Sequence, residues 1–195
     1  MEYHKAKDYI IARLVKELKP ELTYHNIDHT IDVMRSVCRI AEGEGYHSNE
    51  LVLMQTAALY HDSGMLVSYK GHERESVKIA SEVLPGWEYT ASDIERISKM
   101  ILTTEMPQSA STPQEQILCD ADLDYLGRED FFWIAQSLRL EWNTLNIRKT
   151  TLREWYEFQI EFMEGHTYFT ETARKLRNAG KENNLQQIKE LLSKS

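Results

Sequence analysis

Residues 51–64 have the sequence LVLMQTAALYHDSG, an apolar run that ends in a histidine, an aspartate and a glycine. The run from Leu51 to Tyr60 is apolar on nearly every side, and helices of this kind are usually central and buried. Placing His61 beside Asp62 at the end of such a helix is costly unless something pairs them, because buried polar groups lose their hydration. The stretch therefore predicts a central helix that carries a functional pair of side chains.

Further helices are indicated on both sides of this one, joined by short loops. Apolar periodicity and helix-ending glycine or proline predict them at residues 6–18, 28–41, 48–61, 72–84, 92–102, 112–126, 130–142, 152–163, 171–178 and 185–192. Ser48 is a candidate cap, and Ser92 and Thr112 each begin a capping box. No pair of segments has the alternation typical of strands, so the predicted class is all-α.

Length and composition bound the kind of protein. A chain of 195 residues suits one domain, taken here as 1–195, with core motifs within 22–130 and C-terminal helices over 130–195. The C-terminal helices are expected to pack on the core or on a second copy of the chain. Hydrophobic residues make up 42% and charged residues 28%, which is typical of a soluble globular protein.

Charge and cysteine content narrow the partners. The net charge of −8 argues against broad binding to nucleic acid or an anionic membrane, but it does not exclude a nucleotide-sized anion. No secretory leader and no stretch long enough for a membrane span is expected. The two cysteines, Cys38 and Cys119, are expected as apolar fillers in a reducing cytoplasm.

Three segments gather side chains of the kinds that bind metals: YHNIDH at 24–29, YHDSG at 60–64 and CDADLD at 119–124. His29 lies between apolar residues early in its helix, and Asp122 adjoins the apolar side of another. Together with His61 and Asp62 they form a mixed nitrogen and oxygen donor set. Such a set suits Mn²⁺, Fe²⁺, Co²⁺, Ni²⁺ or Zn²⁺ rather than Ca²⁺, and four protein ligands leave room for water and substrate.

A histidine, then a His-Asp pair, then a distant aspartate resembles the signature of the HD-domain metal-dependent phosphohydrolase superfamily. The resemblance covers roughly residues 22–130 and implies an HD-type helical bundle with a C-terminal helical extension. The implied metal ligands are His29, His61, Asp62 and Asp122. The Ala-Asp-Leu context favours Asp122 over its neighbours Asp120 and Asp124, which are expected either around the site or on the helix surface.

The first motif, Tyr-His-Asn-x-x-His, is similar to that of the cyclic-nucleotide phosphodiesterases in this superfamily. There the earlier histidine gives a proton to the leaving oxygen, which implies His25 as a general acid. The segment around His72 resembles one that in some members adds a metal ligand or a phosphate contact. Lys70 and Arg74 flank His72 and are candidates to neutralise phosphate charge. The region 100–105 lacks the further histidines of two-metal members, which favours one ion per site.

The resemblance implies hydrolysis of a phosphoester, expected to be a nucleotide or cyclic nucleotide, by a metal-activated water. Asp62 or a neighbouring carboxylate would orient the nucleophile, and His25 or His72 would protonate the departing oxygen. Two alternatives stay open: a nucleotidase or phosphomonoesterase with the same site, and a regulatory module that binds a nucleotide without turnover. The expected partner is a small phosphoester, and association with a second copy of the chain is left open. Aromatic residues within 131–158 are expected in packing, with a base-stacking pocket as the alternative.

Overall fold

A computed structural model describes residues 1–194 of the chain. The chain is 73% helical, with nine α-helices and no strand in the part that is described. The prediction of an all-α class is therefore confirmed. Across residues 1–194 we find no helix with the length and apolar character needed to cross a bilayer.

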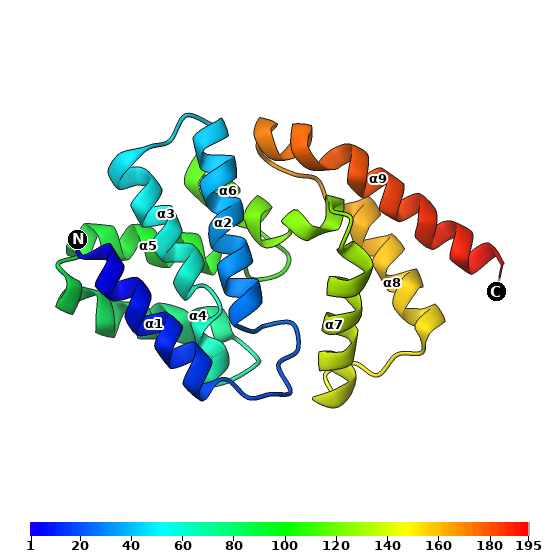
Figure 1. Ribbon diagram of the computed structural model, residues 1–195, viewed down its shortest axis with the longest axis horizontal. Coiled ribbons are helices and arrows are strands. Elements are labelled where there is room, and N and C mark those ends of the chain that lie inside the picture. Colours follow the sequence, from blue (N-terminus) through cyan, green and yellow to red (C-terminus); the bar gives the residue numbers. More distant parts are fainter. Residues whose placement is uncertain (195) are drawn as a thin grey trace.

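The first six helices form a bundle around α3 (Figure 1). They are α1 (Tyr3–Glu17), α2 (Ile27–Gly43), α3 (Ser48–Tyr60), α4 (His72–Val83), α5 (Ala91–Leu102) and α6 (Pro113–Asp122). Three 3-10 turns join them or follow them: η1 (Ser63–Leu66), η2 (Leu84–Trp87) and η3 (Asp124–Gly127). Helix α3 contacts α1, α2, α4, α5 and α6, and every residue from Thr56 to Tyr60 is buried. The apolar run of this helix thus becomes the centre of the bundle, as its sequence predicts.

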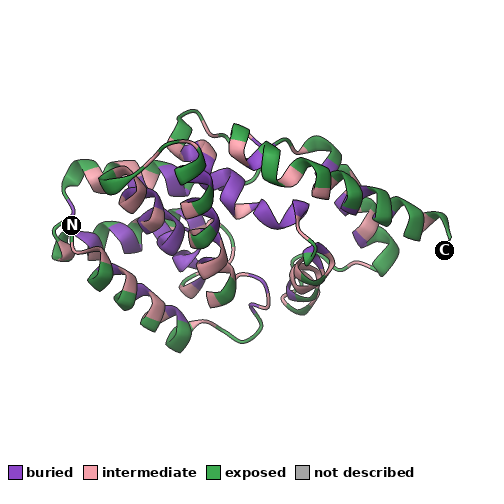
Figure 2. Cartoon of the chain, turned by 45° about the horizontal axis from the view of Figure 1, so that its top comes forward, coloured by how far each residue is buried: buried purple, intermediate pink, exposed green. Residues whose placement is uncertain are grey.

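Three further helices lie beside the bundle and have their own apolar cluster: α7 (Phe131–Thr144), α8 (Leu152–Gly165) and α9 (Glu171–Ser193). Phe131, Trp155 and Ile188 are fully buried in this cluster. Figure 2 shows the buried residues concentrated inside the bundle and on the inner faces of these helices. Most of the aromatic residues expected in packing therefore do pack, although Trp133 is 79% exposed.

Two aspartates attach α9 to the bundle. Asp120 accepts hydrogen bonds from the backbone nitrogens of Phe169 and Thr170, at 2.8 and 2.7 Å, just before α9 begins. Asp124 accepts from the guanidinium of Arg177 at 2.7 Å. Both aspartates are only 1% exposed, so neither is the surface acid that was one of the expectations for them. Their carboxylates instead satisfy donors of the C-terminal helices.

The prediction of separate helices at residues 171–178 and 185–192 is wrong, because α9 is one helix that continues through Gly180. A Cβ on Gly180 would lie 2.1 Å from the carbonyl oxygen of Gly127 in η3. Gly180 is therefore present for close backbone contact between α9 and η3, not for a helix end.

Replacing Gly180 by alanine is expected to destabilise the protein by about 1–3 kcal/mol, because the added methyl group overlaps backbone atoms. In an ordinary helix interior the same change stabilises by about 0.5–1 kcal/mol. Urea unfolding measures the difference. Gly165→Ala is the matched control, since a Cβ there meets no atom within 4 Å. Equal stability of the two variants would contradict the close contact.

Some helix boundaries also differ from the prediction. Thr90, not Ser92, caps α5, because Thr90 and Asp93 bind each other's backbone nitrogens. The box at Thr112 is confirmed, with Pro113 in the first turn. Ser48 is the first residue of α3 and not its cap, a position taken by His47. Helix α6 ends at Asp122 and η3 follows it, where one longer helix was expected.

Candidate metal centre

The first candidate ligand lies in the first turn of α2. The side chain of Asn26 caps this helix by accepting from the backbone nitrogens of Asp28, at 2.9 Å, and His29, at 3.2 Å. Such a cap satisfies backbone donors that the first turn leaves unpaired. It also fixes the direction in which the His29 side chain leaves the helix.

The second and third candidate ligands, His61 and Asp62, follow the end of α3. Nδ1 of His61 donates to the carbonyl oxygen of Ala58 at 2.7 Å, which leaves Nε2 as the nitrogen that can bind a ligand. The next turn is held by Ser76, whose hydroxyl accepts from the Gly64 nitrogen and donates to the His61 carbonyl, at 2.7 and 2.6 Å. A Cβ on Gly64 would lie 1.9 Å from the carbonyl oxygen of His72, so glycine is required for this turn to meet α4.

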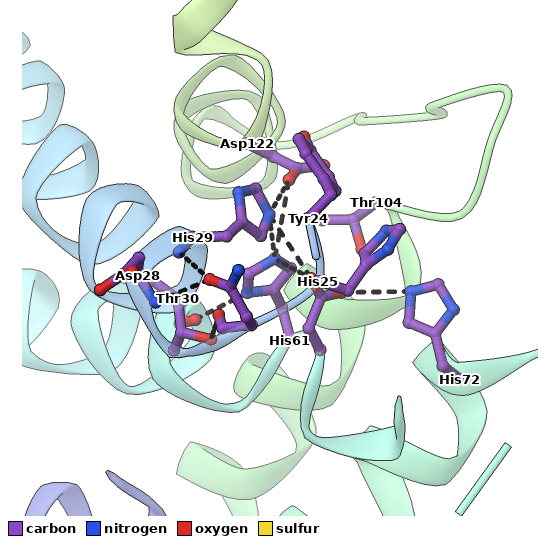
Figure 3. A network of polar contacts seen from close by, with 12 residues as sticks. Tyr24, His25, Asp28, His29, Thr30, His61, His72, Thr104 and Asp122 are labelled. Carbon is purple, nitrogen blue, oxygen red and sulfur yellow. Dashed lines mark hydrogen bonds and ion pairs between the residues drawn. The ribbon is translucent and has the colours of Figure 1, made fainter. Parts of the chain in front are cut away.

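The candidate ligands converge although they are distant in the sequence. Nε2 of His29 lies 3.4 Å from Nε2 of His61 and 3.2 Å from Oδ1 of Asp122. One ligand atom from each of these three residues lies within 4.8 Å of the others. Oδ2 of Asp62 lies 3.4 Å from Nε2 of His29 and 3.2 Å from Nε2 of His61. Figure 3 shows His29, His61 and Asp122 pointing toward one another.

These atoms fit a divalent cation. Oδ2 of Asp62 is buried and has no hydrogen-bond partner among residues 1–194. A buried carboxylate oxygen that makes no hydrogen bond is costly, and a cation between it and the imidazoles of His29 and His61 would compensate it. Two imidazole nitrogens that face each other at 3.4 Å also suit a shared ion better than a direct hydrogen bond. The mixed nitrogen and oxygen donors are those of transition-metal sites.

The charges in the centre act strongly on one another. Burial lowers the pKa of His61, but the carboxylates of Asp62 and Asp122 outweigh it and hold this pKa well above 6.5. Burial raises the pKa of Asp62 and of Asp122, but the neighbouring imidazoles hold both well below the ordinary value. The carboxylates are therefore ionised at neutral pH, as metal ligands must be.

Metal affinity is expected to rise with pH by roughly tenfold per pH unit near neutrality. Because the pKa of His61 is raised in the metal-free protein, a cation must displace a proton from Nε2 at any pH below that pKa. Below the pKa of His61, raising the pH removes the competing proton and strengthens metal binding. Above that pKa the nitrogen is already free, so the affinity stops rising. Titration calorimetry with Mn²⁺ at several pH values measures the slope, and buffers of different ionisation enthalpy count the released protons. An affinity independent of pH would contradict this expectation.

Two more histidines lie to one side of the centre, as Figure 3 shows. The ring centroids of His25 and His72 are 5.6 Å apart. Nε2 of His72 lies 3.1 Å from Oδ1 of Asp62, and its Nδ1 donates to the Tyr69 carbonyl oxygen at 3.0 Å. Burial lowers the pKa of His72, but its hydrogen bond to Asp62 and the nearby negative charges raise it to about 9. Both nitrogens of His72 are thus engaged.

The candidate phosphate-binding side chains lie outside this arrangement. Lys70 and Arg74 are exposed, and the guanidinium of Arg74 lies 4.0 Å from a carboxylate oxygen of Glu105. Contact of either residue with a substrate phosphate stays a prediction.

Sequence reasoning missed Glu141 and the residues around it. The Glu141 carboxylate comes from α7, is 0% exposed and contacts His25 Nδ1. It also accepts from the phenol of Tyr69 at 3.0 Å, and that phenol accepts from the indole nitrogen of Trp142 at 2.8 Å. The only available signal is an acid beside apolar residues of an amphipathic helix, which is too common to single out one residue.

A cavity of about 910 Å³ opens beside the centre, between α2 and α7. The candidate ligands His29 and Asp122 line it, and so do Arg35, Arg128 and Trp133. The volume lies in the usual range for small-molecule sites.

Fold and site together define a class: an all-helical protein with a group of histidines and aspartate between its helices that could hold a metal. The chain belongs to the HD domain family, whose family model matches residues 26–125. HD domains bind divalent metals, and the His29, His61 and Asp122 group could hold one. The matched residues contain all four candidate ligands, whereas His25 and Glu141 lie outside them.

A solved structure is similar over nearly the whole chain. It is the crystal structure of a protein from an uncultured Thermotogales bacterium, described as a predicted HD superfamily hydrolase. The similarity has a TM-score of 0.63 and 24% sequence identity, and covers 96% of this chain and 91% of that one. At this identity the likeness concerns the fold. Comparison with curated proteins gave no significant match.

Proposed function

We propose that the protein is a metal-dependent phosphohydrolase that cleaves a phosphoester of nucleotide size. The HD family and the His-His-Asp group support a metal-dependent hydrolase as the kind of protein. One observation carries the proposal: ligand atoms of His29, His61 and Asp122 lie within 4.8 Å of one another, and a buried oxygen of Asp62 that makes no hydrogen bond lies beside both imidazoles. Phosphoester chemistry is the step beyond the family.

His29, His61, Asp62 and Asp122 would hold the ion, which we propose to be a single transition-metal cation, one of Mn²⁺, Fe²⁺, Co²⁺, Ni²⁺ or Zn²⁺. When bound, it would supply positive charge to a phosphate oxygen and lower the pKa of a water. Asp62 would bind it through Oδ2, because Oδ1 is held by His72 at 3.1 Å. This ion pair leaves Oδ2 facing His29 and His61.

We assign the proton donor to His25 in preference to His72. Both nitrogens of His72 contact acceptors, at 3.0 and 3.1 Å, so releasing a proton would break a contact to Asp62 or to the Tyr69 carbonyl. His25 uses only Nδ1, and its Nε2 has no hydrogen-bond partner within the described part of the chain. An imidazole can give up a proton near neutral pH.

The cavity beside His29 and Asp122 supports a substrate larger than inorganic phosphate. Trp133 on α7 and Arg35 on α2 are both exposed and line this cavity, where an aromatic ring could stack on a nucleobase and a guanidinium could pair with a phosphate. A nucleotide or cyclic nucleotide fits these features. The overall charge of −8 makes a long nucleic acid an unsuitable substrate.

The test is turnover by metal-stripped and metal-reloaded protein across a substrate panel. The panel contains p-nitrophenyl phosphate, bis-p-nitrophenyl phosphate, nucleoside monophosphates and 3′,5′-cyclic nucleotides. Hydrolysis is expected only after metal is restored. Cleavage of diesters supports a phosphodiesterase, and cleavage of monoesters alone supports a nucleotidase or phosphomonoesterase. Metal-loaded protein that binds nucleotides and cleaves none of the panel would support a regulatory module instead.

Replacing His25 by alanine is expected to slow turnover on the order of 100-fold while metal content stays unchanged. The imidazole would supply a proton, and it is separate from the four ligands. Metal analysis and steady-state kinetics on the same sample check both parts. Loss of the metal from this variant would mean that His25 is a ligand.

A further inference from the structure

We propose that Glu141 of α7 is a positioning residue that holds the imidazole of His25 so that Nε2 exchanges the proton with the leaving oxygen. The inference rests on the proposed function. It gives the C-terminal helices a part in the site, because Glu141 lies beyond the 26–125 range that the HD family model matches.

The first support is the setting of the carboxylate. Glu141 is 0% exposed, and its Oε2 accepts from the backbone nitrogens of Tyr24 and His25, at 2.8 and 3.0 Å. Its Oε1 contacts Nδ1 of His25 and accepts from the Tyr69 phenol at 3.0 Å. Burial raises the pKa of Glu141, but these hydrogen bonds, led by that of His25, hold it below the ordinary value. The side chain is therefore an ionised acceptor.

The second support is what the contact does to the ring. A carboxylate on Nδ1 requires the proton to be on that nitrogen, so Nε2 becomes the atom that can take up and release a proton. Buried carboxylates orient imidazoles in this way in other enzymes. The backbone donors of Tyr24 and His25 fix the carboxylate itself, so the ring has little freedom to turn.

The third support is that the same carboxylate reaches the second histidine. Tyr69 donates its phenol to Glu141, and its carbonyl oxygen accepts from Nδ1 of His72 at 3.0 Å. The Tyr69 ring also lies edge-on to the His25 ring, with 5.5 Å between centroids. Trp142 donates to the phenol from the neighbouring position of α7. One carboxylate thus contacts His25 directly and is linked to His72 through Tyr69.

The proton transfer that Glu141 serves is balanced. Water forms a bond to phosphorus and loses a proton to solvent, and the bond from phosphorus to the leaving oxygen breaks with its electron pair on oxygen. That oxygen takes the proton from Nε2 of His25, which later regains one from solvent. A leaving group that is stable as an anion needs no such proton.

The test compares two leaving groups in Glu141→Gln, in His25→Ala and in the double variant, all metal-loaded. For a nucleotide ester, kcat of Glu141→Gln is expected to fall at least tenfold with KM changed less than about twofold. For the corresponding p-nitrophenyl ester, kcat should fall less than about threefold. In the His25→Ala background the Glu141→Gln change should add no further loss. Asp120→Asn is the matched control, a buried carboxylate variant outside the site, and its effect should not depend on the leaving group.

An equal loss for both leaving groups, or a loss that persists without His25, would overturn the proposal and leave Glu141 a structural role. Should Glu141→Gln not fold, Glu141→Asp takes its place, because it keeps the negative charge and has a side chain too short to reach His25 Nδ1. The same two leaving groups are then compared in this variant. Failure of the proposed function is a separate outcome, in which wild-type protein cleaves no phosphoester. A long-range proton–nitrogen NMR spectrum then decides: a proton on Nδ1 of His25 that is lost in Glu141→Gln supports positioning, and a bare Nδ1 in the wild type overturns it.

Discussion

Replacing His61 by alanine is expected to abolish metal binding and phosphoester hydrolysis while the helical fold remains. Nε2 of His61 faces the other three ligands and is held there by the hydrogen bond from Nδ1 to the Ala58 carbonyl. Removing the His61 imidazole takes away one of the two nitrogen donors. It also leaves the carboxylates of Asp62 and Asp122 with less positive charge nearby. Asp62→Ala should have the same effect. Metal content by mass spectrometry, turnover and far-ultraviolet circular dichroism measure the three parts.

The matched control is His47→Ala, which removes an exposed histidine just before the same helix and should leave metal and turnover unchanged. Full activity in either His61→Ala or Asp62→Ala would show that the site is assigned wrongly. Loss of helical content would mean that the variant has unfolded, so that its loss of metal says nothing about the ligands. Asp122→Asn, a smaller change at another candidate ligand, then tests metal binding.

The second large effect is expected on stability. Asp124→Ala should lower the free energy of unfolding by about 2–4 kcal/mol, because it removes a buried carboxylate and leaves the largely buried guanidinium of Arg177 without its partner. Asp124 is 1% exposed and binds Arg177 at 2.7 Å and Arg39 at 3.0 Å. The expected loss lies toward the lower end for buried pairs, because the Arg39 side chain is 44% exposed and can turn to water. Such a loss is a large share of the stability of an ordinary domain.

Urea unfolding measures the loss caused by Asp124→Ala. Glu17→Ala is the comparison, since the ion pair of Glu17 with Arg13 lies at the surface and its removal should leave the unfolding midpoint unchanged. If the two variants unfold at the same urea concentration, Asp124 does not attach α9 to the bundle as the contacts indicate.

The four candidate ligands could be predicted because each violates a local rule. His61 and Asp62 follow the most apolar helix of the chain, Asp122 adjoins the apolar side of α6, and His29 lies between apolar residues at the start of α2. Polar groups in such places need a partner, and their order along the chain matches a known signature. The structure brings them together, but their role in binding metal stays a prediction until metal is measured.

Long-range contacts account for what the sequence did not reveal. Glu141 meets His25 across 116 residues, and nothing local distinguishes it from any acid on an amphipathic helix. Gly180 resembles a helix end by composition, yet it serves contact with Gly127, which is distant in the sequence. Asp120 and Asp124 could not be separated from surface acids without knowing that α9 packs over them. Local patterns predict the elements, whereas partners between elements depend on the tertiary structure.

The central claim is that His29, His61, Asp62 and Asp122 bind one divalent cation. An anomalous-difference map from crystals of the protein soaked in Mn²⁺ tests it most directly. We expect one strong peak about 2.0–2.3 Å from Nε2 of both histidines and from a carboxylate oxygen of each aspartate. A peak bound by other residues, or no peak among these four side chains at saturating Mn²⁺, would contradict the account.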